Sequence, residues 1–132
     1  MGDAEIVMVL DTCAILYLFF EPDKLSHTAL NKIARSEELI VSSISVFEIG
    51  TKLKNKKLKL PLTLSGLVEN LLQVDKIQII PVDEMLWIHA VELPWDHRDP
   101  ADRVIVATAL KLNLAIVTTD AEMRKFYKKT IC

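Results

Sequence analysis

The feature that most constrains the fold of this chain is a regular alternation of short apolar runs with segments of helical periodicity. The run at residues 6–10 contains no polar side chain, as expected of a strand covered on both faces. Similar strands are predicted at residues 39–42, 77–82 and 114–118. Strands that alternate with helices are joined by right-handed crossovers. The sequence therefore predicts an α/β fold, with a parallel sheet of about four to five short strands and helices on both faces.

Capping residues and apolar periodicity predict the helices. Ser26 is expected to cap one helix, Ser45 to open another and Asp83 to cap a third. Asp99 followed by Pro100 predicts the clearest helix, because proline is favoured at the first helical position. The predicted helices comprise residues 12–20, 27–35, 45–54, 64–74, 84–93, 101–111 and 121–128.

Length and composition limit the class of protein to which the chain can belong. The 132 residues are enough for one domain, expected to span 1–132, and an apolar content of 51% excludes disorder. The formal net charge is −2, so a nucleic-acid partner must be argued from local basic patches. The longest uncharged apolar run, residues 14–20, is too short to cross a membrane, and no secretory signal is recognisable. Cys13 and Cys132 form no disulfide framework, so we expect a reduced, cytoplasmic protein.

Several common catalytic motifs are missing from the sequence. The three glycines are scattered, which excludes a P-loop and a GxGxxG dinucleotide fingerprint. There is no HExxH, no GxSxG and no zinc-binding spacing of cysteine and histidine. Cys13 stands where a phosphoaspartyl phosphatase would carry the second acid of its DxD motif, which counts against that class.

Acidic residues follow several of the predicted strands. Asp11 ends the first strand, Glu48 follows the second, Asp99 and Asp102 open a helix, and Asp120 follows the fourth strand. In an open parallel sheet the carboxyl ends of the strands and the next helix N-termini share one edge, where ligands bind. We therefore expect these carboxylates to converge on one crevice.

Helix capping is the alternative explanation for each acid. Asp11, Asp99 and Asp120 could each be an ordinary N-cap, and Ser45 with Glu48 fits a capping box. However, carboxylates about 5 Å apart repel by roughly 3 kcal/mol per pair at an effective dielectric constant of about 20, and capping alone does not require such crowding. Mg²⁺ or Mn²⁺ would remove the repulsion, and a bound ion could position a water for attack on a phosphodiester.

Four short motifs, in this order and at these spacings, resemble a known family. They are VLDT at residues 9–12, SVFEI at 45–49, HRDPADR at 97–103 and VTTD at 117–120. This arrangement resembles the PIN-domain nucleases and, among them, the VapC-type ribonuclease toxins of toxin–antitoxin pairs. The resemblance extends from Ile6 to about Phe126 and implies a PIN-like fold.

The resemblance implies roles for the acids. Asp11, Glu48 and Asp102 match the three core acids of the family, and Asp120 matches a more variable fourth. Asp99 matches an additional acid that can reach the metal through a water, although capping explains it equally well. The residues expected to hydrogen-bond these carboxylates are Thr12, Ser45 and Thr118.

The resemblance also implies a reaction and partners. The expected reaction is hydrolysis of RNA phosphodiester bonds with Mg²⁺ or Mn²⁺ as cofactor, leaving 5′-phosphate and 3′-hydroxyl ends. The expected partners are RNA, a small antitoxin protein and a second copy of the chain. The apolar first helix, residues 12–20, could supply an interface, although burial within the monomer explains it equally well.

Basic residues near these motifs are candidates for binding the RNA backbone. Residues 52–59 contain five lysines and no acid, and Lys54, Lys56 and Lys57 are the expected phosphate contacts. A solvated helix end explains this lysine strip equally well. Arg98 and Arg103 are expected to contact phosphate or to pair with carboxylates.

Two alternative functions remain open from the sequence. The chain could be a non-catalytic PIN-fold interaction module that uses its acids only as caps. It could also be a metal-dependent DNA nuclease or phosphatase that uses the same acids. No motif in the sequence encodes an RNA target, because RNA specificity depends on groove shape and a few contacts.

Overall fold

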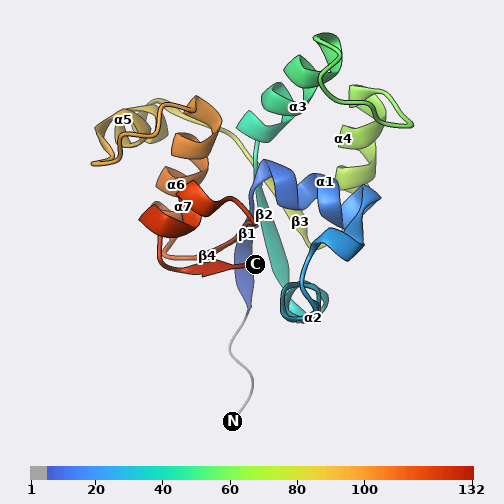
Figure 1. The fold of residues 1–132 in the computed structure, drawn as a ribbon, viewed down its shortest axis with the longest axis horizontal. Helices are drawn as coiled ribbons and strands as arrows, with labels where there is room; N and C mark the ends of the chain where they lie inside the picture. Colours follow the sequence, from blue (N-terminus) through green and yellow to red (C-terminus); the bar gives the residue numbers. More distant parts are fainter. Residues whose placement is uncertain (1–5) are drawn as a thin grey trace.

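The computed structural model describes residues 6–132 and has a five-stranded sheet at its centre (Figure 1). The strand order is β3-β2-β1-β4-β5, and every pair of neighbouring strands is parallel. The strands are β1 (Val7–Leu10), β2 (Glu38–Ser42), β3 (Ile77–Ile80), β4 (Ala115–Val117) and β5 (Thr130–Ile131). This architecture confirms the predicted α/β fold.

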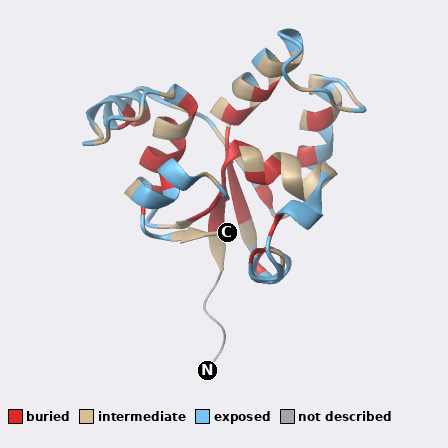
Figure 2. Cartoon of the chain, in the orientation of Figure 1, coloured by how far each residue is buried: buried red, intermediate tan, exposed pale blue. Residues whose placement is uncertain are grey.

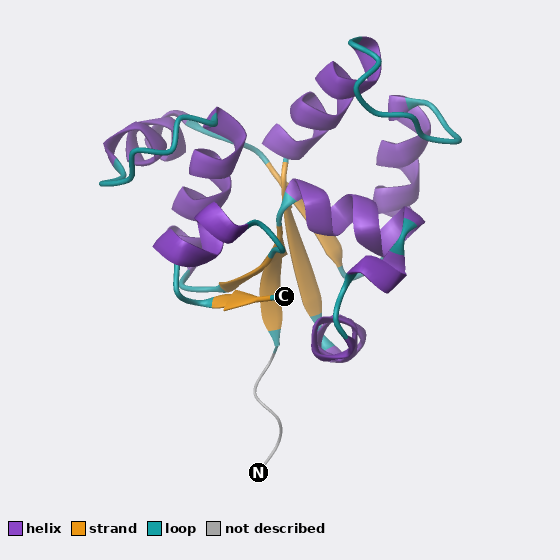
Figure 3. Cartoon of the chain, viewed as in Figure 1, coloured by secondary structure: helices purple, strands orange, loops and turns teal. Residues whose placement is uncertain are grey.

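Helices cover both faces of the sheet (Figure 3). They are α1 (Thr12–Phe20), α2 (His27–Arg35), α3 (Ile44–Lys54), α4 (Leu64–Gln73), α5 (Glu84–Glu92), α6 (Pro100–Leu112) and α7 (Ala121–Phe126), with a short 3-10 turn η1 (Pro22–Lys24). In the part of the chain that the structure describes, no helix has the length and apolarity needed to span a membrane.

The apolar runs of the strands divide the core into two layers (Figure 2). Met8 and Leu10 of β1 pack with helices α1 to α4, whereas Val9 between them packs with α6 and α7. This alternation is why β1 contains no polar side chain, since successive side chains point to opposite faces of the sheet. Strand β1 is central and pairs with both β2 and β4, and Leu10 lies beside Val41 and Val117.

The strands and helices differ from the predicted elements mainly at their ends. Strand β3 stops at Ile80 because the next residue, Pro81, has no N–H to donate to a neighbouring strand. Helix α7 ends at Phe126, two residues early, and the chain then forms β5, which pairs with β4. Strand β5 was not among the four predicted strands, since two residues are too few to give a periodic signal.

The apolar surface of α1 is covered within the monomer. Ile15 is fully buried, and Leu16, Leu18, Phe19 and Phe20 are half-buried against the core. The structure therefore favours the burial explanation for this helix. Large exposed apolar side chains lie elsewhere, on α3 and α5, and comprise Phe47, Met85, Trp87, Ile88 and Val91.

Candidate active site

Three of the predicted acids are helix N-caps at the carboxyl edge of the sheet. The Asp11 Oδ1 atom accepts a hydrogen bond of 2.7 Å from the Ala14 N–H and caps α1. Asp99 Oδ1 accepts from the Asp102 N–H at 3.1 Å, and Asp120 Oδ1 accepts from the first turn of α7. Each cap uses one carboxylate oxygen, so capping fixes the side chain and leaves Oδ2 available to a ligand.

Glu48 is not part of a capping box. Helix α3 begins at Ile44 with Ser43 as its N-cap, which places Ser45 inside the first turn and Glu48 in the second. Glu48 Oε2 lies 3.5 Å from Lys52 Nζ, whereas Glu48 Oε1 is buried and has no hydrogen-bond partner among the described residues. A buried carboxylate oxygen without a partner is costly unless a cation or a donor reaches it. Capping therefore does not explain the position of Glu48.

Asp102 lies in the first turn of α6 and is held by a histidine. Asp102 Oδ2 and His97 Nε2 are 2.7 Å apart, and this contact raises the pKa of His97. His97 in turn stacks on Trp95, with ring centroids 4.6 Å apart, and Trp95 stacks on Phe126 at 4.8 Å. No local sequence pattern indicates this aromatic stack, because Phe126 lies 29 positions beyond His97 in the chain.

The acids influence one another electrostatically. Burial raises the pKa of Asp11 to about 6, hydrogen bonds from Thr118 and Ala14 oppose this, and the charges of Asp102 and Asp120 add to it. Burial also raises the pKa of Asp102 to about 6, opposed by His97 and reinforced by the charges of neighbouring acids. Those neighbours are Asp99, Asp120 and Glu48. Asp11 and Asp102 are therefore each subject to the like charge of other predicted acids, a repulsion that a bound cation would relieve.

These pKa values predict how stability depends on pH without divalent cations. The free energy of unfolding should rise as the pH is lowered from about 7.5 towards about 5. The folded protein protonates Asp11 and Asp102 near pH 6, whereas an aspartate in an unfolded chain has a pKa of 3.8, so the folded protein binds more protons in this interval. Urea unfolding at several pH values measures the effect, and Asp11→Asn should show a smaller rise. A free energy that falls steadily on acidification would contradict this account.

The three hydroxyl residues expected to support the carboxylates divide into two groups. Thr118 lowers the pKa of Asp11 and accepts a hydrogen bond of 3.0 Å from the Asp120 N–H. Thr12 and Ser45 are also buried, but their hydroxyls bond each other at 2.9 Å and so join α1 to α3. These two hydroxyls therefore link two helices, and their expected bonds to the carboxylates stay a prediction.

The donor set suits a hard divalent cation. The five predicted acids offer only carboxylate oxygens, including the unpartnered Glu48 Oε1, and Mg²⁺ and Mn²⁺ prefer such ligands. In residues 6–132, however, no three acidic, histidine or cysteine side chains are arranged as a ready coordination group. Lys52 and His97 occupy Glu48 Oε2 and Asp102 Oδ2, so an ion must compete with these contacts.

Arg103 has a structural role instead of the expected contact with phosphate or a carboxylate. Its guanidinium donates to five backbone carbonyls, two in the last turn of α5 and three in the segment that joins α5 to α6. The acceptors are the carbonyls of Ala90, Val91, Leu93, Trp95 and His97. Because its donors are engaged in this way, Arg103 holds the loop that carries His97. We therefore do not expect Arg103 to contact the substrate.

The other predicted basic residues are at or near the surface. Lys54, Lys56, Lys57 and Arg98 all lie on the outside of the molecule. Lys57 helps to line a cavity of about 450 Å³ that also includes Glu48 and Asp99, so this lysine lies beside two of the acids. Lys56 has a left-handed backbone, with φ of 57°, at the turn that ends α3.

Comparisons with known proteins agree with this arrangement. Ribonuclease VapC22 of Mycobacterium tuberculosis (strain ATCC 25618 / H37Rv) is 29% identical over 118 residues, which are 89% of each chain. A toxin–antitoxin complex from Klebsiella pneumoniae has a similar fold, with a TM-score of 0.65 and 16% identity over 95% of this chain and 96% of that one. VapBC2 from Rickettsia felis, solved with a DNA fragment from its promoter, gives a TM-score of 0.67 and 16% identity over 96% and 98%. The sequence pattern of the PIN domain matches residues 8–129, and the chain therefore belongs to the PIN domain family.

Proposed function

We propose that this PIN domain is a metal-dependent endoribonuclease of the VapC type and the toxin of a toxin–antitoxin pair. The observation that carries the proposal is the buried Glu48 oxygen without a hydrogen-bond partner, together with the like charges that act on Asp11 and Asp102. The similarity to a ribonuclease named VapC22 supports RNA as the substrate. The similarity of the fold to proteins in toxin–antitoxin complexes supports a small antitoxin as partner.

Asp11, Glu48, Asp102 and Asp120 would hold the Mg²⁺ or Mn²⁺ ion, and Asp99 would reach it through a water. When bound, the ion lowers the pKa of a water molecule and screens the charge of the phosphoryl oxygens. The role of the surrounding protein groups is to hold the carboxylates in a defined orientation. The Ala14 N–H and Thr118 orient Asp11, and His97 orients Asp102.

Comparing three substrates tests the reaction class. We expect purified protein with Mn²⁺ to cleave single-stranded RNA and to leave DNA of the same sequence and a phosphomonoester largely intact. EDTA should abolish the cleavage, since the carboxylates alone cannot activate water. Preferred hydrolysis of DNA or of the monoester would favour a different phosphoesterase. Failure to hydrolyse any substrate, with no binding of Mn²⁺ by calorimetry, would favour an interaction module whose acids are caps.

We propose that the lysines after α3 hold the RNA backbone. Changing Lys54, Lys56 and Lys57 to Gln should weaken RNA binding and reduce the slope of log K against log[salt] by about 0.7 for each lost contact. Cleavage at saturating RNA should stay near the wild-type rate, because these side chains do not bond the acids. Filter binding in EDTA at several salt concentrations measures the slope.

The control for this experiment changes Lys32, Lys111 and Lys128 to Gln, which alters net charge equally at exposed positions away from the acids. If both triple variants show the same slope, the lysines after α3 are only a solvated helix end.

We propose that the exposed apolar side chains on α3 and α5 form a homodimer interface. Val91 is 75% exposed and Phe47 is 72% exposed, which is unusual for such large apolar groups on a monomer. Val91→Glu should therefore shift the mass seen by sedimentation equilibrium from twice 14.9 kDa to a single chain. The matched control is Leu72→Glu, another exposed apolar residue, on α4. A wild-type protein that sediments as a monomer would contradict the proposal.

A further inference from the structure

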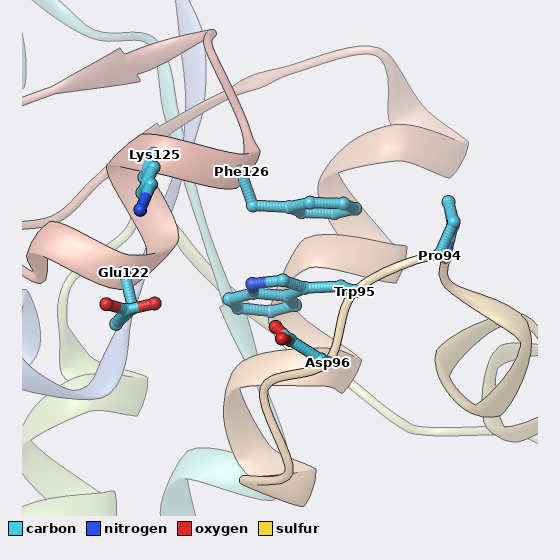
Figure 4. Close-up of a pocket in the computed structure, with 6 residues that line it drawn as sticks. All are labelled: Pro94, Trp95, Asp96, Glu122, Lys125 and Phe126. Carbon is cyan, nitrogen blue, oxygen red and sulfur yellow. The ribbon is translucent and has the colours of Figure 1, made fainter.

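A pocket of about 620 Å³ opens beside the aromatic stack that ends at His97. Figure 4 shows its lining, which comes from the loop before α6 and from α7. The lining residues are Pro94, Trp95, Asp96, Glu122, Lys125 and Phe126. None of these residues is one of the five predicted acids, so the pocket is a separate feature of the surface.

The pocket is nevertheless joined to the acids by direct contacts. Asp120 caps α7, the helix that supplies Glu122, Lys125 and Phe126 to the pocket wall. On the other wall, Trp95 stacks on His97, and His97 bonds Asp102. A molecule in this pocket would therefore touch side chains that are linked to Asp102 and Asp120. The pocket lies beside α7, which packs in one core layer, whereas α3 packs in the other (Figure 1).

The pocket is shaped to read the edge of a base, since the indole faces are already occupied. Phe126 stacks on the indole of Trp95 with the two rings almost parallel, at 6°, and His97 also stacks on it. A ligand would therefore contact the edge of the Trp95 ring. The indole nitrogen on this edge is turned towards Glu122 and Lys125 (Figure 4). The indole N–H can only donate, as can the Lys125 ammonium group.

The charges in the pocket argue against a phosphate as its main occupant. Asp96 and Glu122 contribute two carboxylates and Lys125 one ammonium, so the lining carries an excess of one negative charge. The carboxylates can only accept hydrogen bonds. The lining thus combines carboxylates, each able to take two N–H bonds, with donors that can meet a carbonyl oxygen.

We propose that this pocket holds an unpaired guanine base of the RNA, next to the phosphate to be cleaved. The proposal rests on the proposed ribonuclease function. Guanine presents a carbonyl oxygen (O6) beside two adjacent donors (N1–H and N2–H₂), which matches a donor beside a carboxylate. Uracil presents a single N–H between two carbonyls, and adenine and cytosine each present one amine beside an acceptor. Single-stranded RNA is generally read in this way, through the exposed edges of splayed bases.

Binding of short RNA without cleavage tests the proposal. The probes are four fluorescein-labelled hexanucleotides, UUUGUU, UUUAUU, UUUCUU and UUUUUU, titrated with the protein in EDTA and followed by fluorescence anisotropy. We expect the guanine-containing probe to bind about 5- to 150-fold more tightly than the others, the range for one good bidentate pair. Glu122→Gln or Asp96→Asn should remove this preference, because a carboxamide has only one acceptor oxygen and adds a donor.

The control variant is Glu69→Gln, which makes the same change at an exposed position on α4 and should keep the wild-type ranking. Equal binding of all four probes by the wild type would overturn the proposal, as would a guanine preference that survives both pocket variants. Equal binding that weakens only in Lys125→Gln would also overturn it, since the pocket would then hold backbone alone. Cleavage of a long RNA in Mn²⁺ is measured separately. Cleavage without guanine preference defeats this inference alone, and guanine preference without cleavage defeats the proposed reaction.

Discussion

Asp11→Asn should reduce RNA cleavage by about a thousandfold or more, since a bound cation supplies several kcal/mol of transition-state stabilisation and about 1.4 kcal/mol corresponds to a factor of ten. The amide oxygen of Asn can still accept the Ala14 N–H, so the N-cap of α1 and the fold should survive. Cleavage of labelled RNA at saturating Mn²⁺ measures the loss. Glu48→Gln and Asp102→Asn should behave alike, whereas Asp99→Asn should be milder because Asp99 is proposed to reach the ion only through a water.

Thermal unfolding provides the control for this prediction. In EDTA the Asp11→Asn protein should melt at or above the wild-type temperature, because the change removes a buried carboxylate whose pKa is raised to about 6. Mn²⁺ should raise the melting temperature of the wild type by binding the native state and should do so less in the variant. A variant with wild-type turnover would return Asp11 to the role of an ordinary cap.

Arg103→Met should destabilise the protein by about 3 kcal/mol or more, the second large effect that we expect. The change removes five hydrogen bonds from a charged donor and leaves five carbonyls without this donor. A single hydrogen bond to a charged group makes a net contribution of about 1.5–3 kcal/mol, and water can reach part of this loop. Arg103→Lys should recover little of the lost stability, because an ammonium group cannot reproduce the planar fork of a guanidinium. Urea unfolding measures the loss.

Arg98→Met is the matched control, since Arg98 lies near the surface on the same loop and its loss should change stability by no more than about 0.5 kcal/mol. Amide exchange should also accelerate in the segment between α5 and α6, which Arg103 holds together. Equal stability of the two variants would show that water replaces the guanidinium at no cost.

The overall fold could be predicted because local signals determine it. The apolar run before Asp11 has no polar residue, and the structure places it at the centre of the sheet with both faces covered. Asp99 with Pro100 marked the start of α6 to within one residue. Strand β5 could not be predicted, because two residues are too few to show a periodic pattern. This strand is defined only by its pairing with β4.

The site was only partly predictable, for a different physical reason. Spacing alone located the acids, but it could not separate capping from ligand binding, and the structure shows that Asp11, Asp99 and Asp120 are caps that each use one carboxylate oxygen. The contacts of Arg103 and the Thr12–Ser45 bond depend on how distant segments meet. No local pattern records such contacts.

The pairing of β1 with both β2 and β4 has a consequence for synthesis of the protein. Chains emerge from the ribosome N-terminus first, so β1 can pair with β2, and Leu10 with Val41, early in synthesis. Leu10 cannot pair with Val117 of β4 until that later strand has been made. Asp102 and Asp120 also lie in the last part of the chain, so a partly synthesised chain carries Asp11 and Glu48 without the other two. The set of acids proposed to hold the ion can therefore assemble only after Asp120 has been synthesised and β4 has paired with β1.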